Sequence, residues 1–321
     1  MIYDVRHVTT YRYDAPVAAA RCTLRLLPVD GPGQRVFATD LEIAPRPAAV
    51  VERTDFFGAR VATVMITTAH RELRIAADSQ VEVTRAIDSA PATQQTPPWE
   101  VVRQRAAASA DVGPRGPAHF IYPSRLVPLH GPATAYAAES FSAGRPVVEA
   151  ATELMQRLHR DFRFDPEATC IATPLADVFE TRGGVCQDFA HAAIAALRGI
   201  GLPAAYVSGY IRTEPPPGQP RLVGADASHA WVSLWCGDQC GWVDFDPTNA
   251  VIAGDDHIVV ARGRDYADVS PIDGVFLGSG GQSLEVSVDV TPRVPAAVPR
   301  DRDVEAIQEA TRKQCFVPPR V

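Results

Sequence analysis

Alternating apolar and polar positions dominate the first quarter of the chain. Five stretches alternate or cluster β-branched and aromatic residues, as half-buried strands do, and turn signals such as "DGPGQ" and "FFGA" separate them. No helical periodicity lies between them, so we expect residues 1–88 to form an antiparallel β-sandwich or barrel-like domain. The five stretches are "YDVRHVTTYRY", "RCTLRLLPV", "QRVFATDLEIAP", "ARVATVMITT" and "ELRIAADSQVEVTR".

The pattern changes after this domain. Residues 89–145 begin with a linker-like composition, "SAPATQQTPPWE", and continue with the candidate helix "WEVVRQRAAASA" and a stretch punctuated by proline and glycine. Residues 146–291 show helical periodicity first and strand alternation afterwards, which predicts an α+β unit with antiparallel strands. Its segment 283–290 predicts an edge strand. Residues 292–321 form a proline-rich tail with one candidate helix, "DVEAIQEATRKQ".

Two helices and three strands are predicted in the α+β unit, besides the helix that carries a cysteine. "RPVVEAATELMQRLHRDFRFD" has an apolar stripe at helical spacing, and "TPLADVFETRGG" predicts a short helix that ends at the glycines. The strand signals are "AAYVSGYIR", "SHAWVSLWC" and "GWVDFDP". The proline-rich loop 214–224 leads into the second strand, and we expect it to flank a substrate cleft.

Charge and composition exclude several function classes. The net charge of −7 comes without any run rich in lysine and arginine, so we expect no binding to nucleic acid or to anionic membranes. The opening "MIYDVRHVTTYRYD" interrupts each apolar stretch with a charge, and no apolar run is long enough for a membrane span. We therefore expect a cytoplasmic protein.

The six cysteines are expected to be reduced in that compartment, because disulfides are rare there. Cys236 and Cys240 resemble half of a zinc site, but no second pair of ligands follows at the required spacing. We expect no metal and no other cofactor.

Cys186 stands directly after two glycines in "TRGGVCQDFAHAAIAALRGIGLP". Gly184 and its neighbour Gly183 allow a sharp reversal and leave room beside the thiol, and helical spacing of apolar residues runs from Cys186 to Arg198. In the first turn of a helix the unpaired amides and the dipole stabilise a thiolate and can form part of an oxyanion hole. The alternative is a small apolar residue that packs in the core.

A hairpin supplies the partners. "SHAWVSLWCGDQCGWVDFDPTN" predicts two strands around a short loop, and a loop at Gly237–Gln239 places His229 within one position of Asp246. Asp244 then lies about 7 Å further along the ladder. A bulge would shift this register by one residue, so the pattern favours Asp246 without excluding Asp244. The carboxylate would fix the imidazole tautomer while the other ring nitrogen faces the thiol.

These motifs resemble a known family. "GGVCQDFA", "SHAWVSLW" and "GWVDFDPTN" are similar to the three core motifs of the transglutaminase-like superfamily, in its bacterial branch of cysteine protease-like proteins with a β-rich N-terminal domain. The resemblance extends over about residues 1–291. It implies a papain-like core in which a cysteine-bearing helix packs on an antiparallel sheet. It also implies that Cys186 is the nucleophile, His229 the base and Asp246 the residue that orients it.

The chemistry implied is acyl transfer from an amide or peptide bond through a thioester. Water as the acceptor gives a protease or amidase, which we favour; an amine gives a transglutaminase or ligase. A binding module that keeps the fold without activity is the third reading. No "DxDxDG"-type loop is present, so we expect no calcium dependence. The family's upstream tryptophan has only Trp99 as a counterpart, in an apparent linker.

Further residues are expected around the site, and a peptide or protein is the expected partner. Flanking or oxyanion roles fall to Gly184, Gln187, Asp226 and Trp231. Substrate contacts are the expectation for Asp188, His191, Arg264, Asp265 and Tyr266, with capping, solvated or structural roles as the alternative. Trp231 and Trp235 would line a substrate channel or, alternatively, belong to the core.

Overall fold

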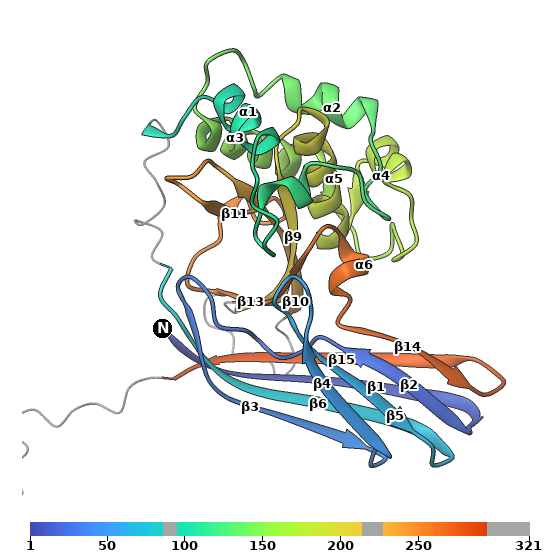
Figure 1. The fold of residues 1–321 in the computed structure, drawn as a ribbon. Helices are drawn as coiled ribbons and strands as arrows, with labels where there is room; N and C mark the ends of the chain where they lie inside the picture. Colours follow the sequence, from blue (N-terminus) through green and yellow to red (C-terminus); the bar gives the residue numbers. More distant parts are fainter. Residues whose placement is uncertain (86–94, 214–226, 294–321) are drawn as a thin grey trace, which may run out of the picture.

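Two antiparallel sheets of four strands each form a β-sandwich in the computed structural model, which describes residues 1–85, 95–213 and 227–293 (Figure 1). The first sheet has the order β15 (Gln282–Pro292), β1 (Ile2–Val17), β6 (His70–Val83), β3 (Gln34–Ala44). The second has the order β14 (Ile272–Leu277), β2 (Ala19–Leu24), β5 (Arg60–Ile66), β4 (Ala49–Thr54).

All five strands expected in the N-terminal region are present, and β4 is an addition that the pattern analysis missed. Every residue of β4 is exposed, so this edge strand carries no alternation of buried and exposed positions. The inner strands do alternate: the burial of β6 switches along most of its length. Periodicity therefore found the strands that have a buried face.

The last two strands return to the sandwich. The edge strand expected at 283–290 exists within β15, and it pairs with β1, where Val5 lies opposite Val290. β14 pairs with β2 in the other sheet. The sequence analysis assigned both segments to the α+β unit of residues 146–291. In the structure they belong to the sandwich, and the α+β core is inserted between β6 and β14. Pairing between strands more than 250 residues apart depends on tertiary packing and leaves no local signal.

The core is a five-stranded antiparallel sheet covered by helices (Figure 1). Its strand order is β12 (Val251–Ile252), β11 (Trp242–Asp246), β10 (Ala227–Trp235), β9 (Ala204–Ile211), β13 (His257–Gly263). The helices are α1 (Trp99–Ala107), α2 (Gly131–Ala138), α3 (Val147–Asp161), α4 (Leu175–Thr181), α5 (Cys186–Gly199) and α6 (Tyr266–Val269), with a 3-10 turn at Pro117–Phe120. Two residues each form β7 (Arg163–Phe164) and β8 (Gly183–Gly184), which pair in parallel.

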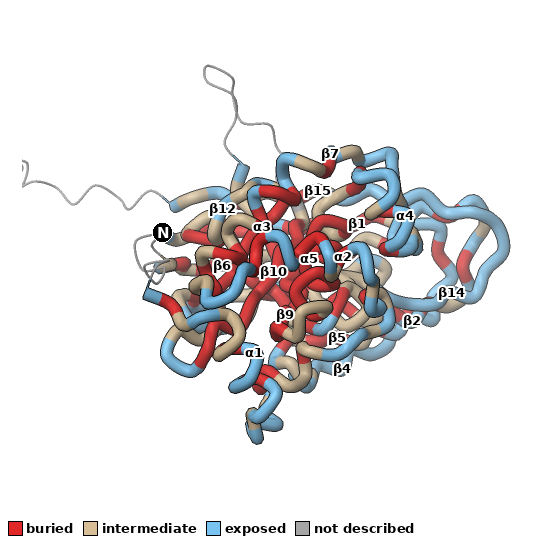
Figure 2. The backbone as a smooth tube through the Cα atoms, turned by 90° about the horizontal axis from the view of Figure 1, so that it is seen from above, coloured by how far each residue is buried: buried red, intermediate tan, exposed pale blue. Residues whose placement is uncertain are grey.

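Helix α5 packs on β9 and β10 and forms the centre of the core. Its residues Ala190 and Ile194 are fully buried in one cluster with Leu234 of β10. Figure 2 shows buried backbone gathered around α5 and β10, whereas the loop beyond β14 is exposed. The predicted fold class, a β-sandwich followed by a papain-like α+β core, is therefore confirmed.

The sandwich and the core share a hydrogen-bonded interface. Tyr210 of β9 donates its hydroxyl to Leu26 O at 2.8 Å, and the Gln34 amide bonds both the N–H and the C=O of Val259. No helix within the described residues is long and apolar enough to cross a bilayer. The proline-rich loop 214–224 and the candidate helix in the tail lie outside the described residues.

Candidate active site

Cys186 is the first residue of α5, as the sequence predicts. Val185 is the N-cap residue, and its amide donates to the Asp188 carboxylate at 2.8 Å. Because amides in the first turn have no acceptor within a helix, the Cys186 N–H points out of the helix start. The thiol is partly exposed and forms no disulfide. A partly exposed sulfur at this position can meet a substrate.

Asp188 completes the cap of α5 and is not free for substrate. Its Oδ2 accepts bonds from the Thr169 hydroxyl at 2.6 Å and from Val185 N. The side chain is buried, and burial raises its pKa. This arrangement explains the glycine before it, because a Cβ on Gly184 would lie 2.4 Å from Asp188 Oδ2. The space that we expected beside the thiol holds the capping carboxylate.

The hairpin of β10 and β11 pairs one residue away from the predicted register. Val232 lies opposite Phe245 and Trp235 opposite Trp242, with the loop over residues 236–241. The sequence analysis had allowed for a register shift of one residue in this hairpin. The shift places His229 on the same face as Asp246, because residues directly opposite one another point to the same side of a sheet.

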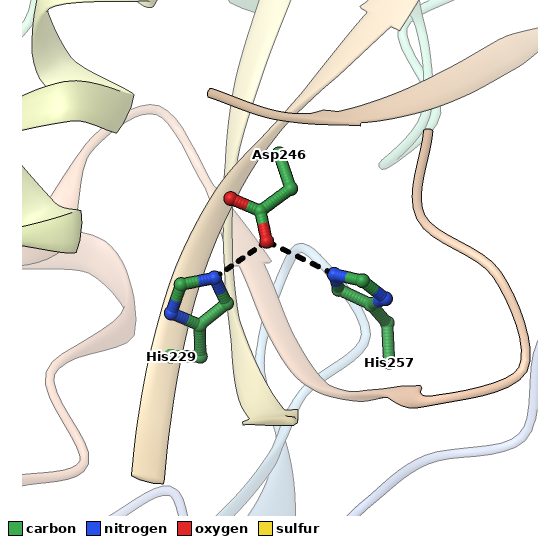
Figure 3. Close-up of side chains that lie close together, drawn as sticks. All are labelled: His229, Asp246 and His257. Carbon is green, nitrogen blue, oxygen red and sulfur yellow. Dashed lines mark hydrogen bonds and ion pairs between the residues drawn. The ribbon is translucent and has the colours of Figure 1, made fainter. Parts of the chain in front are cut away.

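His229 and Asp246 are in direct contact. His229 Nε2 lies 2.7 Å from Asp246 Oδ2, and both side chains are buried (Figure 3). This bond occupies Nε2, so Nδ1 is the nitrogen left for the sulfur. The tautomer follows from the hydrogen-bond network.

The Cys186 side chain is the second group that acts on His229. Burial lowers the pKa of His229, but hydrogen bonds to Asp246 and Cys186 outweigh burial and raise that pKa to about 10. Burial would also raise the pKa of Asp246, yet its hydrogen bonds from His229 and His257 hold that pKa well below its usual range. The structure therefore brings Cys186, His229 and Asp246 together.

Two residues that the sequence analysis did not single out also bind Asp246. His257 Nε2 lies 3.1 Å from Oδ2, and Asn249 Nδ2 lies 2.7 Å from the same atom. Oδ1 accepts the backbone N–H groups of Thr248 and Asn249. Asn249 follows from the turn motif "DPTN", but His257 approaches from β13, and nothing local in a single sequence places it there.

His229, Asp246 and His257 form the one cluster of metal-ligand side chains found within the described residues. Its geometry is that of a hydrogen-bonded carboxylate: three donors bind Oδ2 and two bind Oδ1. A cation would have to displace histidine protons that already have an acceptor. Cys236 and Cys240 find no third ligand in the described part of the chain.

Trp231 is a core residue beneath the site. It is fully buried, and its ring stacks on the His229 ring with 6.1 Å between the ring centroids. Its Nε1 donates to Asp244 Oδ2 at 3.2 Å. Trp235 is also buried. The core alternative therefore holds for both tryptophans, although Trp231 does flank His229.

Asp244 belongs to a separate network. Arg262 binds both of its oxygens, at 3.0 and 2.8 Å, and Ser233 donates to it. Burial raises the pKa of Asp244, but Arg262 outweighs burial and holds that pKa well below its usual range.

The segment 264–266 has structural partners. Arg264 forms a two-pronged ion pair with Asp268. Asp265 is buried, caps α6 at Ala267 N and accepts Leu126 N. The Tyr266 amide donates to His191 Nε2, and burial lowers the pKa of His191 to about 4, so this histidine is neutral.

Three further positions were named in the sequence analysis. Gln187 is half-buried beside Cys186, and its amide donates to Ile171 O at 3.4 Å. The Trp99 indole donates to Ser142 O, so that group already has an acceptor. Asp226 lies outside the described residues.

Comparison with known proteins covers both parts of the chain. Residues 3–82 match the family described as the bacterial transglutaminase-like N-terminal region, and residues 134–247 match the transglutaminase-like superfamily. An uncharacterized protein of Mycobacterium bovis is 40% identical over 303 residues, which are 90% of this chain and 92% of that protein. A protein-glutamine gamma-glutamyltransferase of Pseudomonas aeruginosa is 35% identical over 131 residues, 39% of this chain and 20% of that protein.

A solved structure has the same fold over nearly the whole chain. The crystal structure of a "putative cysteine protease" from Cytophaga hutchinsonii aligns with a TM-score of 0.69 and 18% identity, covering 92% of each chain. At this identity the likeness concerns the fold alone. It includes the sandwich as well as the core.

Proposed function

The chain belongs to the transglutaminase-like superfamily, and on this premise we propose that it is an enzyme that transfers acyl groups from amide bonds through a thioester on Cys186. One observation carries the proposal. Cys186 begins a helix, its side chain contributes to the raised pKa of His229, and His229 Nε2 binds the buried Asp246. Nucleophile, base and orienting group are the three parts that covalent acyl transfer needs.

The first half-reaction forms the thioester. The Cys186 thiolate attacks the amide carbonyl carbon, and the first-turn N–H of Cys186 stabilises the oxyanion. His229 then donates its Nδ1 proton to the nitrogen as the C–N bond breaks, which releases the amine. Asp246 stays ionised and holds the imidazole through Nε2.

The second half-reaction decides the class of enzyme. In hydrolysis, His229 Nδ1 takes a proton from water, whose oxygen attacks the thioester carbonyl. The C–S bond breaks, the acid leaves, and the thiolate and imidazolium form again. We propose hydrolysis of a peptide or protein amide in a reducing compartment. The hydrolysis proposal takes up the description of the solved structure that shares the fold, a "putative cysteine protease", and the five described cysteines, all free, support the compartment.

Transamidation is the second candidate. The similarity of 131 residues to a protein-glutamine gamma-glutamyltransferase favours it, because the same three groups serve an amine acceptor. The two reactions differ only in what attacks the thioester.

Iodoacetamide labelling tests the nucleophile. Cys170 is exposed, and hydrogen bonding from Thr173 lowers its pKa, so this thiol would compete for the reagent. The experiment therefore uses a Cys170→Ala background and follows Cys186 by mass spectrometry at mildly acidic pH. We expect selective labelling of Cys186 that His229→Ala suppresses. Labelling no faster than that of the buried Cys22 would mean an inert fold with no enzymatic role.

An amide library then separates the two candidate reactions. Peptide amides are incubated with and without a labelled primary amine, and a Cys186→Ala variant serves as the control. Release of acid in both conditions supports hydrolysis. Cys186-dependent incorporation of the amine supports transamidation.

A further inference from the structure

His257 binds the oxygen of Asp246 that also binds His229. Its Nε2 lies 3.1 Å from Oδ2, and the two histidines approach this atom from different strands, β10 and β13 (Figure 3). His257 is 3% exposed, so it cannot reach a substrate. The proposed mechanism assigns it no step.

The surroundings of His257 fix the orientation of its ring. Nδ1 is buried and has no hydrogen-bond partner among the described residues. Asp246 Oδ2 accepts in this contact, so His257 Nε2 carries the proton of the hydrogen bond. The Trp231 ring packs edge-on against the His257 ring, with 5.2 Å between the ring centroids, and limits rotation of the imidazole. His257 is thus a fixed donor to Asp246.

Residues of the N-terminal sandwich hold the backbone around His257. Gln34 receives Val259 N at 2.7 Å and donates to Val259 O at 2.8 Å, which imitates a pair of strand hydrogen bonds. Arg85 Nη2 donates to His257 O at 2.8 Å. The Tyr3 hydroxyl donates to Asp256 at 2.9 Å. The N-terminal region therefore binds the chain at residues 256, 257 and 259.

We propose that His257 is a positioning residue for Asp246, and that the sandwich acts on the site by holding His257 in place. This inference rests on the proposed function. A carboxylate can rotate about its last side-chain bond, and a second fixed donor on Oδ2 restricts that rotation. The position of Oδ2 determines where His229 Nε2 lies. Because the imidazole ring is rigid, it also determines that Nδ1 points toward the sulfur.

Two substitutions at His257 test the proposal in the Cys170→Ala background. His257→Phe keeps a ring and removes the donor, whereas His257→Gln keeps an N–H that can reach Asp246. The readout is the rate of Cys186 alkylation by iodoacetamide against pH. For the Phe variant we expect a rate about 10- to 100-fold lower at mildly acidic pH, the size of effect found when the hydrogen-bond partner of a metal-bound histidine is removed. The Gln variant should recover most of the wild-type alkylation rate. A role of His257 in filling space alone would not predict this recovery.

Substitutions in the sandwich provide the second arm and its control. Gln34→Leu removes the bonds to Val259 and should shift the alkylation profile toward alkaline pH, as for an ordinary thiol. Tyr210→Phe removes an interface hydrogen bond of similar length, to Leu26 O, and keeps every side-chain bond to residues 256–259, so it should leave the profile unchanged.

The outcomes separate the two proposals. If Cys186 of the wild type labels no faster than an ordinary thiol, the proposed function fails and this inference with it. If wild-type Cys186 is selectively labelled but folded His257→Phe has the same rate and profile, only the positioning role is wrong. Should the Phe variant not fold, a wild-type profile in Gln34→Leu overturns the role in the same way.

Discussion

Asp244 and Asp246 point to the same face of β11, two residues apart, and bind different partners. Arg262 holds Asp244 with two hydrogen bonds, and Trp231 and Ser233 complete its shell. Asp246 binds His229 instead. Both carboxylates are buried and ionised, so the two residues differ in their partner: Asp244 holds Arg262, whereas Asp246 orients His229.

Replacement of Asp246 by asparagine should remove most activity. The amide cannot stabilise an imidazolium as a carboxylate does and presents an N–H where a lone pair is needed, so His229 loses its fixed tautomer. A loss of about 10²- to 10⁴-fold is expected, by analogy with the serine protease triad. The measurement is the rate of Cys186 acylation by an activated ester, with the Cys170→Ala background as reference.

Asp244→Asn is the matched control, because it makes the same chemical change two residues away. It leaves the buried Arg262 partly uncompensated and should lower the free energy of unfolding by about 3 kcal/mol. Its effect on acylation of the folded protein should stay below about tenfold, since Asp244 does not touch His229. Equal losses of activity in both variants would contradict the separate roles of the two carboxylates.

His229 makes stability depend on pH. Hydrogen bonds to Asp246 and Cys186 raise its pKa to about 10 despite burial. The resulting stabilisation is complete below the unfolded-state pKa of about 6.5 and is lost as the pH rises toward the folded-state pKa. Urea unfolding at about pH 6, 8 and 10 should show wild-type stability declining more steeply than that of His229→Gln. Parallel pH dependences would show that His229 does not carry this charge.

Gly184 should not tolerate a side chain. In Gly184→Ala the new Cβ would lie 2.4 Å from Asp188 Oδ2 and 2.8 Å from Asp188 Cβ, and Thr169 and Val185 hold that carboxylate in place. We expect a loss of about 1–3 kcal/mol in the free energy of unfolding, measured in urea, from overpacking at the start of α5. Gly131→Ala is the control, because nothing lies within 4 Å of its Cβ position. A stability loss of the same size in both variants would rule out the clash as its cause.

Removal of metal ions should leave the reactivity of Cys186 unchanged. The Asp246 oxygens already accept bonds from three side chains and two backbone amides, so the hydrogen bonds alone hold the cluster together. The alkylation rate is compared before and after dialysis against EDTA, and then with added zinc or calcium. A rate that falls on chelation and returns with one of these ions would disprove the expectation.

Local features of the sequence were sufficient for much of the fold. The five alternating stretches, the start of α5 at Cys186 and the end of α4 before the glycines all follow from side-chain periodicity and capping, which depend on neighbouring residues. The exposed strand β4 has no buried face and therefore no pattern. The hairpin was predictable to within one residue, because its two strands are joined by a short loop.

By itself, the sequence determined which segments become helices and strands, that a cysteine begins a helix, and that a histidine and an aspartate lie on adjoining strands. Only the tertiary structure decided that β14 and β15 complete the sandwich, that Asp188 caps α5, and that His257 shares Asp246 with His229. Helical and strand periods arise between residues a few positions apart. The contacts of His257 and β15 join segments distant in the chain, and the packing of the whole molecule selects them.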